Sequence, residues 1–289
     1  MIDVVFNFKL LGAKDGVTLT VSDSASGDSA TLTGTGVTAG ALAFSGDPAF
    51  GVVDVSGNLQ RDFTITNTGG TSIGPLIVSS SNNTEFTAAM TGTTCAGMTL
   101  IASGTCTQRV TFAPGAYGAK STNLTVGPSG GVGQVVQALG GTGRDQVTMN
   151  LTFAGTGSGS VAMPSSGSVS GTAQNCTTTC SKAYYRTSAT TAVALAATPT
   201  ATATTTWSIG SCSGNNCSVL LDASPKPVTV TFTAAQYTLT MNMAQFPSGS
   251  GAGGSVTFAG NTCNTASSCT TRSVGVDSGT AVTVTVTPD

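Results

Sequence analysis

Short runs in which an apolar residue alternates with Thr recur from one end of the chain to the other. Clear examples are GVTLTVSD from Gly16, KPVTVTFTA from Lys226 and TAVTVTVTPD from Thr280. Successive side chains of a β-strand point to opposite faces, so this period of two indicates strands with one buried face. Gly, Pro, Asn and Ser separate the runs, as is typical of turns between antiparallel strands. The sequence therefore predicts an all-β fold.

A disordered linker rich in Ser, Thr and Gly is the alternative interpretation of such a composition. Two observations argue against it. Val, Leu, Ile and Phe recur at a fixed strand phase, and the mean hydropathy is +0.23. Thr is β-branched and favours strands, which explains how so polar a chain folds.

The charge content argues against several classes of protein. Only 8% of the 289 residues are charged, with 10 Lys and Arg against 12 Asp and Glu, and there is no His. Nucleic-acid binding depends on neutralisation of phosphates by Lys and Arg, and no basic cluster is present. No apolar run approaches the roughly 18 residues of a membrane span. His is the commonest general base and metal ligand, so we expect a non-catalytic protein without cofactor, metal, nucleic-acid partner or membrane span.

The eight Cys residues fall into four pairs of near neighbours. An even number of closely paired Cys in a chain without His indicates local disulfides. Zinc is the alternative, but the four separations do not repeat the short gap of zinc ribbons and fingers. Disulfides persist in oxidising compartments, so we expect the protein outside the cell or at its surface. The expected pairs are Cys95 with Cys106, Cys176 with Cys180, Cys212 with Cys217 and Cys263 with Cys269.

Two different repeats define the expected domains. GAK at residues 12–14 aligns with GAK at residues 118–120, and LTGTG from Leu32 aligns with LGGTG from Leu139. In the second half, residues 180–199 align with residues 269–288 at a constant shift. The expected domains are the C-terminal part of one repeat (1–36), a complete domain (37–144), a complete smaller domain (145–234) and a truncated second copy of it (235–289).

The complete segments resemble two known families. Residues 37–144 resemble a choice-of-anchor D repeat, an immunoglobulin-like domain of the Hydin-like or ASH type, through LAFSGDPAFGVVDVSG, FTITNTGG, RVTFAPGAYGAKSTNLTV and the closing LGGTG. Residues 145–234 resemble a divergent internalin B-repeat through GTGSGSVAMPSSG, NCTTTCSKAYY, WSIGSCSGNNCSVLL and KPVTVTF. The resemblance implies an immunoglobulin-like β-sandwich followed by small disulfide-stapled β-modules in an elongated array.

The resemblance also implies a function. Repeats of these families belong to bacterial cell-surface or secreted proteins, where they serve as non-catalytic stalk modules for spacing, display or adhesion to a protein or glycan. The alternative is that they are substrate- or wall-binding accessory modules of a secreted hydrolase whose catalytic domain lies outside this chain. A weaker alternative is the decoration of a phage capsid or tail. Residues 1–16 carry no export signal, so we expect a longer protein that includes neighbouring repeats.

Three aromatic residues are candidate ligand contacts. Trp207 is the only Trp and precedes Cys212 by five residues. Covering the Cys212–Cys217 bridge in the core is the favoured interpretation, and stacking on a sugar is the alternative. Tyr184 and Tyr185 are consecutive on a predicted strand and point to opposite faces, so we expect one in the core and the other at the surface.

Two glycine-rich segments predict turns rather than nucleotide sites. NTGG at residues 67–70 follows the strand RDFTIT, and GTGSGS at residues 155–160 lies between strand runs. Gly readily takes positive φ angles, which suits tight turns. Neither segment has the spacing or the following helix of a phosphate-binding motif.

The disulfide pairing is testable by peptide mapping of the unreduced protein. We expect mass spectrometry to find four bridges, each between the near neighbours named above, because short loops between close Cys residues close readily. Free thiols, or bridges between distant Cys residues, would contradict this pairing.

Overall fold

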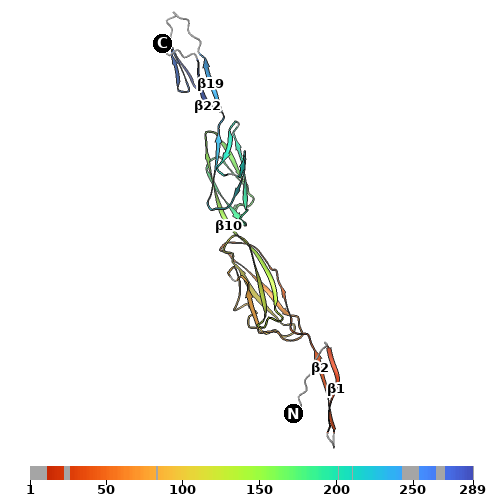
Figure 1. Ribbon diagram of the computed structural model, residues 1–289. Coiled ribbons are helices and arrows are strands. Elements are labelled where there is room, and N and C mark those ends of the chain that lie inside the picture. Colours follow the sequence, from red (N-terminus) through yellow and green to blue (C-terminus); the bar gives the residue numbers. More distant parts are fainter. Residues whose placement is uncertain are drawn as a thin grey trace. The chain divides into compact units, whose positions relative to one another are not determined.

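The computed structural model describes residues 12–22, 27–82, 84–200, 202–209, 211–242, 254–264 and 271–288. All regular structure in these residues is β-strand, which confirms the predicted all-β class. None of them forms a helix with the length and apolarity needed to cross a membrane. The chain divides into two compact units, Met1–Asp145 and Gln146–Asp289, and each contains a hydrophobic core of its own. Figure 1 draws the strands of both units as arrows.

The first unit contains a sandwich of two β-sheets. One sheet has the order β3–β5–β8–β7 and is antiparallel throughout. The other has the order β6–β9–β10, and β4 pairs in parallel with the remaining edge of β10. The first ten residues of the long strand β10 belong to this sheet. The strands are β3 (Leu42–Ser45), β4 (Ala49–Asp54), β5 (Leu59–Asn67), β6 (Leu76–Ser80), β7 (Phe86–Ala88), β8 (Thr105–Phe112), β9 (Gly118–Pro128) and β10 (Val135–Ala154).

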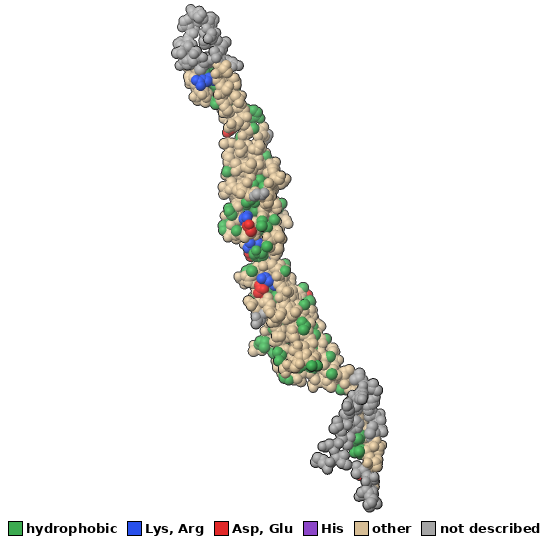
Figure 2. Space-filling model, viewed as in Figure 1, with side chains coloured by type: hydrophobic (Ala, Val, Ile, Leu, Met, Phe, Trp, Pro, Cys, Tyr) green, Lys and Arg blue, Asp and Glu red, His purple; other side chains and the backbone are tan. Residues whose placement is uncertain are grey.

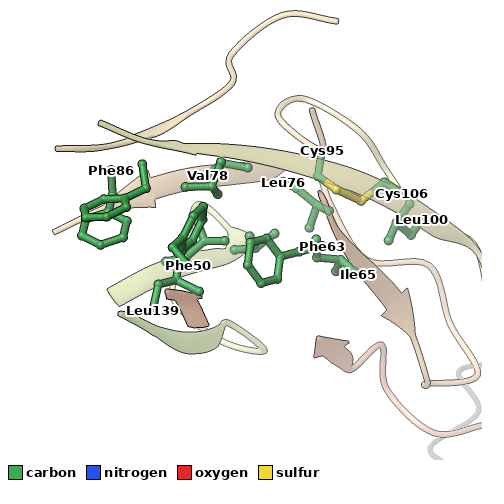
Figure 3. Packing of buried hydrophobic residues seen from close by; sticks show 14 of the residues in the cluster. Phe50, Phe63, Ile65, Leu76, Val78, Phe86, Cys95, Leu100, Cys106 and Leu139 are labelled. Atoms are coloured by element: carbon green, nitrogen blue, oxygen red, sulfur yellow. A yellow bond between two sulfur atoms is a disulfide. The ribbon is translucent and has the colours of Figure 1, made fainter. Parts of the chain in front are cut away.

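Alternate residues of both sheets fill the core of this sandwich, as the period of two predicts. Phe63 and Ile65 of β5 are fully buried, while the residues between and around them are partly or fully exposed. Opposite them, Leu76 and Val78 of β6 point inward from the second sheet (Figure 3). Packing of this kind removes the inner face of each strand from water and leaves Thr on the outer face.

An aromatic cluster closes one end of this core. The rings of Phe86 and Phe112 stack with their centroids 4.5 Å apart, and Phe50 contacts both at 5.6 and 5.7 Å. The ring of Phe112 lies against the backbone of β10 at Gly141. A Cβ atom at Gly141 would come within 2.5 Å of that ring, so only Gly fits at this position.

The second unit contains another sandwich, formed by residues 147–233. One sheet has the order β15–β18–β10, with β13 also paired to β10, and β18 runs parallel to β10. The other sheet has the order β12–β11–β14–β17–β16. The strands are β11 (Gly159–Met163), β12 (Gln174–Cys176), β13 (Cys180–Arg186), β14 (Ala192–Pro199), β15 (Thr204–Trp207), β16 (Cys212–Ser213), β17 (Asn216–Leu220) and β18 (Lys226–Thr233).

Both sheets again contribute alternate residues to the core of this sandwich. Met149 and Leu151 of β10 are fully buried, as are Val219 of β17 and Val230 of β18. None of the residues buried in this core belongs to the core of the first unit. Each sandwich therefore has a hydrophobic cluster of its own.

The strand registers reproduce the first sequence repeat. β1 (Gly12–Ser22) and β2 (Gly27–Gly36) form a two-stranded antiparallel sheet in which Ala13 lies opposite Thr35. In the complete sandwich, the equivalent residues Ala119 of β9 and Thr142 of β10 also lie opposite each other. The strand pair β1–β2 therefore corresponds to two central strands of the complete sandwich.

The second sequence repeat is reproduced in the same way. The remaining strands are β19 (Gln236–Asn242), β20 (Gly254–Phe258), β21 (Asn261–Asn264), β22 (Thr271–Asp277) and β23 (Val284–Pro288). Val256 of β20 lies between Cys263 and Val286 of its two neighbours. Val161 of β11 lies in the same way between Cys176 and Ala197. The sheet β21–β20–β23 therefore corresponds to β12–β11–β14.

The predicted turn at residues 67–70 is organised by the fully buried side chain of Asn67. Its Oδ1 accepts hydrogen bonds from the N–H groups of Ala41 (3.2 Å) and Gly69 (3.0 Å). Its Nδ2 donates to the carbonyl oxygens of Thr71, Leu100 and Ile101 at 2.8 to 3.1 Å. One amide thus satisfies backbone groups from three loops, which would otherwise be left without partners inside the protein.

Replacement of Asn67 by Ala should therefore destabilise the first sandwich by about 2–4 kcal/mol, because several buried backbone groups lose their partner. Urea unfolding of the full chain measures this loss. Asn58→Ala, at an exposed Asn of the same sandwich, is the matched control and should change stability by less than about 0.5 kcal/mol. Equal stability of the two variants would contradict the role assigned to Asn67.

Candidate ligand-binding site

Three of the four predicted Cys pairs are bonded in the structure. The structure joins Cys95 to Cys106, Cys176 to Cys180 and Cys212 to Cys217. Cys263 is also disulfide-bonded, and its expected partner Cys269 lies outside the described residues. The six Cys residues of these three bridges are therefore structural staples of the two sandwiches.

Trp207, at the end of β15, lies beside the bridge between Cys212 and Cys217. The indole is half-buried and packs against the core of the second unit together with Ile209 and Cys212. Its Nε1 donates a 3.0 Å hydrogen bond to the carbonyl oxygen of Gly214, which lies inside the loop closed by the bridge. This arrangement matches the favoured interpretation of Trp207 as a cover over the bridge, and stacking on a ligand stays a prediction.

The two consecutive Tyr residues of β13 have different environments. Tyr184 is fully buried, and its hydroxyl donates to the carbonyl oxygen of Pro164 at 3.2 Å. Burial raises the pKa of Tyr184 to about 12. Tyr184 is therefore a core residue and is not available to a ligand at the surface. Tyr185 points to the other face and is half-buried, so it remains the candidate contact of the pair.

The structure does not bring Trp207 and Tyr185 together. Trp207 belongs to β15 and Tyr185 to β13, and the strands β18 and β10 lie between them in the same sheet. With neighbouring strands about 4.8 Å apart, the two residues are separated by roughly 14 Å across the sheet. These aromatic residues therefore do not form one compact ligand site.

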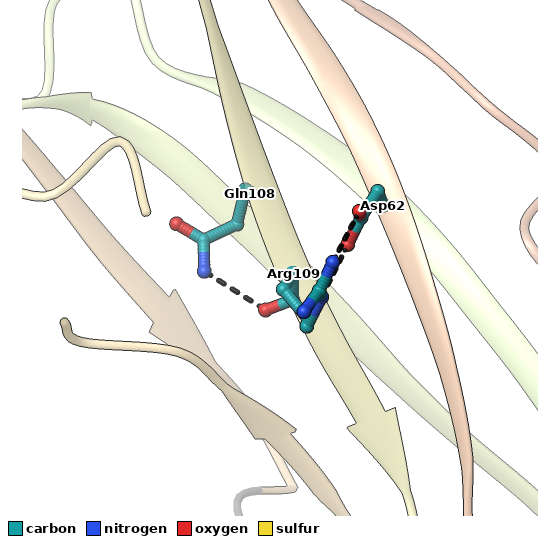
Figure 4. Close-up of polar contacts among 3 residues, drawn as sticks. All are labelled: Asp62, Gln108 and Arg109. Carbon is teal, nitrogen blue, oxygen red and sulfur yellow. Dashed lines mark hydrogen bonds and ion pairs between the residues drawn. The ribbon is translucent and has the colours of Figure 1, made fainter. Parts of the chain in front are cut away.

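Sequence reasoning missed a polar cluster on strand β8. Gln108 is fully buried, and its Oε1 accepts hydrogen bonds from Cys95 N–H and Thr94 Oγ1, each at 3.0 Å. Its Nε2 donates to the carbonyl oxygen of Ala89 at 2.8 Å. It also donates to the carbonyl oxygen of Arg109 at 3.0 Å (Figure 4). The amide therefore attaches the loop before the Cys95–Cys106 bridge to the sheet. Only the inward phase of Gln108 within TCTQRVTF could have indicated this role.

The neighbouring residue Arg109 faces outward and forms a paired ion bridge. Its Nε and Nη2 donate to the two carboxylate oxygens of Asp62 on β5, both at 2.7 Å (Figure 4). The hydrogen bonds and the charge of Arg109 hold the pKa of Asp62 below its usual range. Exposed pairs of this kind contribute about 0.2–1 kcal/mol, so the bridge helps to align the two strands and adds little stability.

A second polar cluster lies at Glu85, the only Glu of the chain. Lys120 Nζ is 2.8 Å from Glu85 Oε1, which also accepts a 3.2 Å hydrogen bond from the N–H of Gly115. Asn82 Nδ2 donates to Glu85 Oε2 at 3.4 Å. Burial tends to raise the pKa of Glu85, but the hydrogen bonds from Lys120, Gly115 and Asn82 together lower it. This cluster fixes the β6–β7 connection beside β9.

Charged groups on the described surface occur mainly as opposite pairs. Figure 2 shows scattered basic and acidic side chains, several of them in contact, among a much larger area of uncharged side chains. Within the described ranges, no group of three or more His, Cys, Asp or Glu residues has an arrangement suited to a metal ion. The ion pairs are Arg61–Asp47, Arg109–Asp62, Lys120–Glu85, Arg144–Asp54 and Lys226–Asp222.

The hollows in the described surface are open and shallow. One, of about 590 Å³, lies over β4, β9 and β10 and is lined mainly by small residues such as Ala49, Gly51 and Ala138. Another, of about 410 Å³, lies between β19 and β23 and is lined by Tyr237, Leu239, Val282 and Val284. Both linings also carry polar groups, Lys120 and Thr142 in the first and Asp277, Ser278 and Thr280 in the second.

Comparison with known proteins assigns no family to this chain. No protein-family model matches it, and no curated protein matches it. Among solved structures, an ASH/PapD-like domain of human CEP192 is 12% identical, with a TM-score of 0.26, over 35% of this chain and 82% of that domain.

Two enzymes of known structure also share partial likeness. A family 123 glycoside hydrolase from Clostridium perfringens is 7% identical, with a TM-score of 0.31, over 40% of this chain and 30% of that chain. The secreted serine protease VesC from Vibrio cholerae is 13% identical, with a TM-score of 0.30, over 86% of this chain and 46% of that chain. This chain thus spans less than half of either enzyme, and likenesses at these scores assign no activity to it.

The lowered pKa of Glu85 predicts a dependence of stability on pH. A carboxyl group with a lowered folded pKa stabilises the fold above its unfolded pKa, and this contribution is lost as the pH falls through the folded value. Glu85→Gln should therefore be less stable than the natural chain at pH 7, and the difference should shrink on acidification to pH 3.

Urea unfolding at both pH values measures this difference. Asp62→Asn is the matched control, because it breaks an exposed pair and should change stability less at pH 7. A difference between Glu85→Gln and the natural chain that is the same at both pH values would contradict the assignment.

Proposed function

We propose that this chain consists of non-catalytic stalk modules from a bacterial cell-surface or secreted protein. The modules would provide spacing and display, and they would present surface for adhesion to a protein or glycan. The observation that carries the proposal is the presence of two sandwiches that bury separate hydrophobic clusters and are each stapled by disulfides. Modules that hold themselves together independently suit serial arrangement in a longer protein.

The chemistry of the described surface supports the same proposal. The ionisable groups with defined contacts serve as strand-aligning pairs or loop anchors, as at Asp62 and Glu85. Catalysis by a hydroxyl nucleophile requires a base and an orienting group close to it. Short-range disulfides in every core supply resistance to unfolding without a large apolar interior, which suits a protein exposed to the medium.

The localisation and family form part of the proposal. The three bridges fit an oxidising environment. The motifs of residues 37–144 and 145–234 favour the choice-of-anchor D and internalin B-repeat families. Together they support a bacterial surface or secreted setting, with Trp207 and Tyr185 as the candidate ligand contacts.

Stretching single molecules of the full chain tests the stalk function. We expect two separate unfolding events, one for each sandwich. Reduction should increase the chain length released when the first sandwich unfolds by roughly 40 Å. The intact bridge keeps the eleven residues between its Cys residues from extending. The variant Cys95→Ala/Cys106→Ala should release this greater length without reduction. One cooperative event for the whole chain would contradict independent modules.

A binding experiment separates adhesion from the role of a hydrolase accessory module. Retention of the full chain on insoluble polysaccharide or cell wall, with quenching of Trp207 fluorescence, would favour the accessory role. Retention on a protein surface without such quenching would favour adhesion. Hydrolysis of any of these materials by the purified chain would overturn the proposal.

A further inference from the structure

Three side chains of the first sandwich bring an amine, a carboxylate and a carboxamide together. Lys120 Nζ lies 2.8 Å from Oε1 of Glu85, and Asn82 Nδ2 donates to Oε2 of the same carboxylate at 3.4 Å. The side chains of Lys120 and Glu85 are only 20% and 15% exposed. One carboxylate, largely shielded from water, therefore bridges the amine and the amide.

The backbone at Asn82 is fixed directly against β9. The N–H of Asn82 donates to the hydroxyl of Thr122 at 2.9 Å, and the N–H of Ser81 donates to the carbonyl oxygen of Asn123 at 3.1 Å. Thr122 and Lys120 are two residues apart on one strand, so their side chains point to the same face about 7 Å apart. The flexible four-carbon stem of Lys120 can span this separation, so its amine can reach the side chain of Asn82.

Glu85 orients the carboxamide of Asn82 at both of its ends. The backbone N–H of Glu85 donates to Asn82 Oδ1 at 3.2 Å, and the carboxylate accepts from Nδ2. A donor at the amide oxygen stabilises the negative charge that develops there when a nucleophile attacks the carbon. A carboxyl group beside the amide nitrogen can deliver the proton that this leaving group needs. The contacts of Asn82 are thus those required for transfer of its acyl group.

Aromatic side chains border the cluster. Phe86 follows Glu85 and is fully buried against the ring of Phe112, with the two centroids 4.5 Å apart. Lys120 lies opposite Gly141, the residue of β10 against which the Phe112 ring packs. Limited access of water lowers the energy needed to move a proton from Lys120 to Glu85, because both products are neutral. A neutral amine is the form that attacks an amide carbon.

We propose that Lys120 and Asn82 form an isopeptide crosslink, with Glu85 as the group that moves the protons. Lys120 first transfers a proton to Glu85 Oε1, and its free Nζ attacks Cγ of Asn82 to form the Nζ–Cγ bond. The electron pair of the carbonyl group moves to Oδ1 and returns as the Cγ–Nδ2 bond breaks. Nζ loses a second proton, and Nδ2 gains two protons through Glu85 and leaves as ammonium. The lysine ammonium supplies both protons, so no further reactant is needed.

The crosslink is a single modification of the chain itself, and it forms slowly after folding. The folded chain first holds the ion pair, in which the amine is protonated. The pH dependence expected for Glu85→Gln and the length gained on reduction both belong to this unreacted form. Once formed, the crosslink closes a loop from Asn82 to Lys120 that contains the Cys95–Cys106 bridge.

Mass spectrometry of the full chain during prolonged incubation tests the proposal. The reduced chain should become lighter by about 17 Da, the mass of the ammonia that is released. Digestion should then yield one pair of peptides joined between Asn82 and Lys120, and trypsin should no longer cleave after Lys120. A constant mass, or a loss of ammonia without joined peptides, would overturn the proposal.

Two variants of the full chain separate the roles of the three groups. Lys120→Arg is the matched control, because Arg keeps a positive charge beside Glu85 but stays protonated and does not attack the amide. It should show no loss of mass, and a loss equal to that of the natural chain would overturn the proposal. Glu85→Gln keeps the size of the side chain and should slow crosslinking at least tenfold. An unchanged rate would contradict the role assigned to Glu85.

Stretching distinguishes the crosslink from the stalk function. After reduction, crosslinked molecules should release roughly 130 Å less than Lys120→Arg when the first sandwich unfolds, because the segment between residues 82 and 120 stays closed. Equal lengths would contradict a link between these two residues. Both chains should still show one unfolding event for each sandwich, so failure of the crosslink leaves the stalk function standing.

Discussion

The burial of alternate side chains between facing sheets determines the rest of this structure. Each core depends on side chains that point inward at a strict period of two, as in β8 and β18. A slip of one residue would turn every such side chain toward water, so the register of each strand has to be held firmly. The cross-strand ion pairs, the short disulfides and the glycine at position 141 all help to hold the strands in register.

Much of this fold could be predicted from local sequence, because its main determinants are local. The alternation of apolar residues with Thr indicates which residues of a strand point inward, so it predicts the strands and their buried faces. The paired Cys residues are close in the sequence, so their spacing predicts the bridges. Tyr184 shows the limit of pattern, since alternation says that consecutive Tyr residues face opposite ways but does not say which one the core contains.

The anchoring amides could not be predicted in the same way. Asn67 and Gln108 gain their roles from backbone groups of loops that are distant in sequence and are brought together only by folding. Glu85 and Lys120 likewise meet because β9 passes beside the connection after β6. In the sequence, Asn67 is an ordinary turn residue and Gln108 is a polar residue at an inward position of a strand. Their importance comes from the cost of leaving buried backbone groups without partners.

The pairing of charges has a consequence for how this surface meets other molecules. Because Arg61, Arg109, Lys120, Arg144 and Lys226 each lie against a carboxylate, their fields largely cancel within a short distance. Such a surface exerts little electrostatic attraction on an approaching partner, so its encounters proceed without steering and depend weakly on ionic strength. Association through its hydroxyl and backbone groups is therefore slow, and its rate changes little with salt concentration.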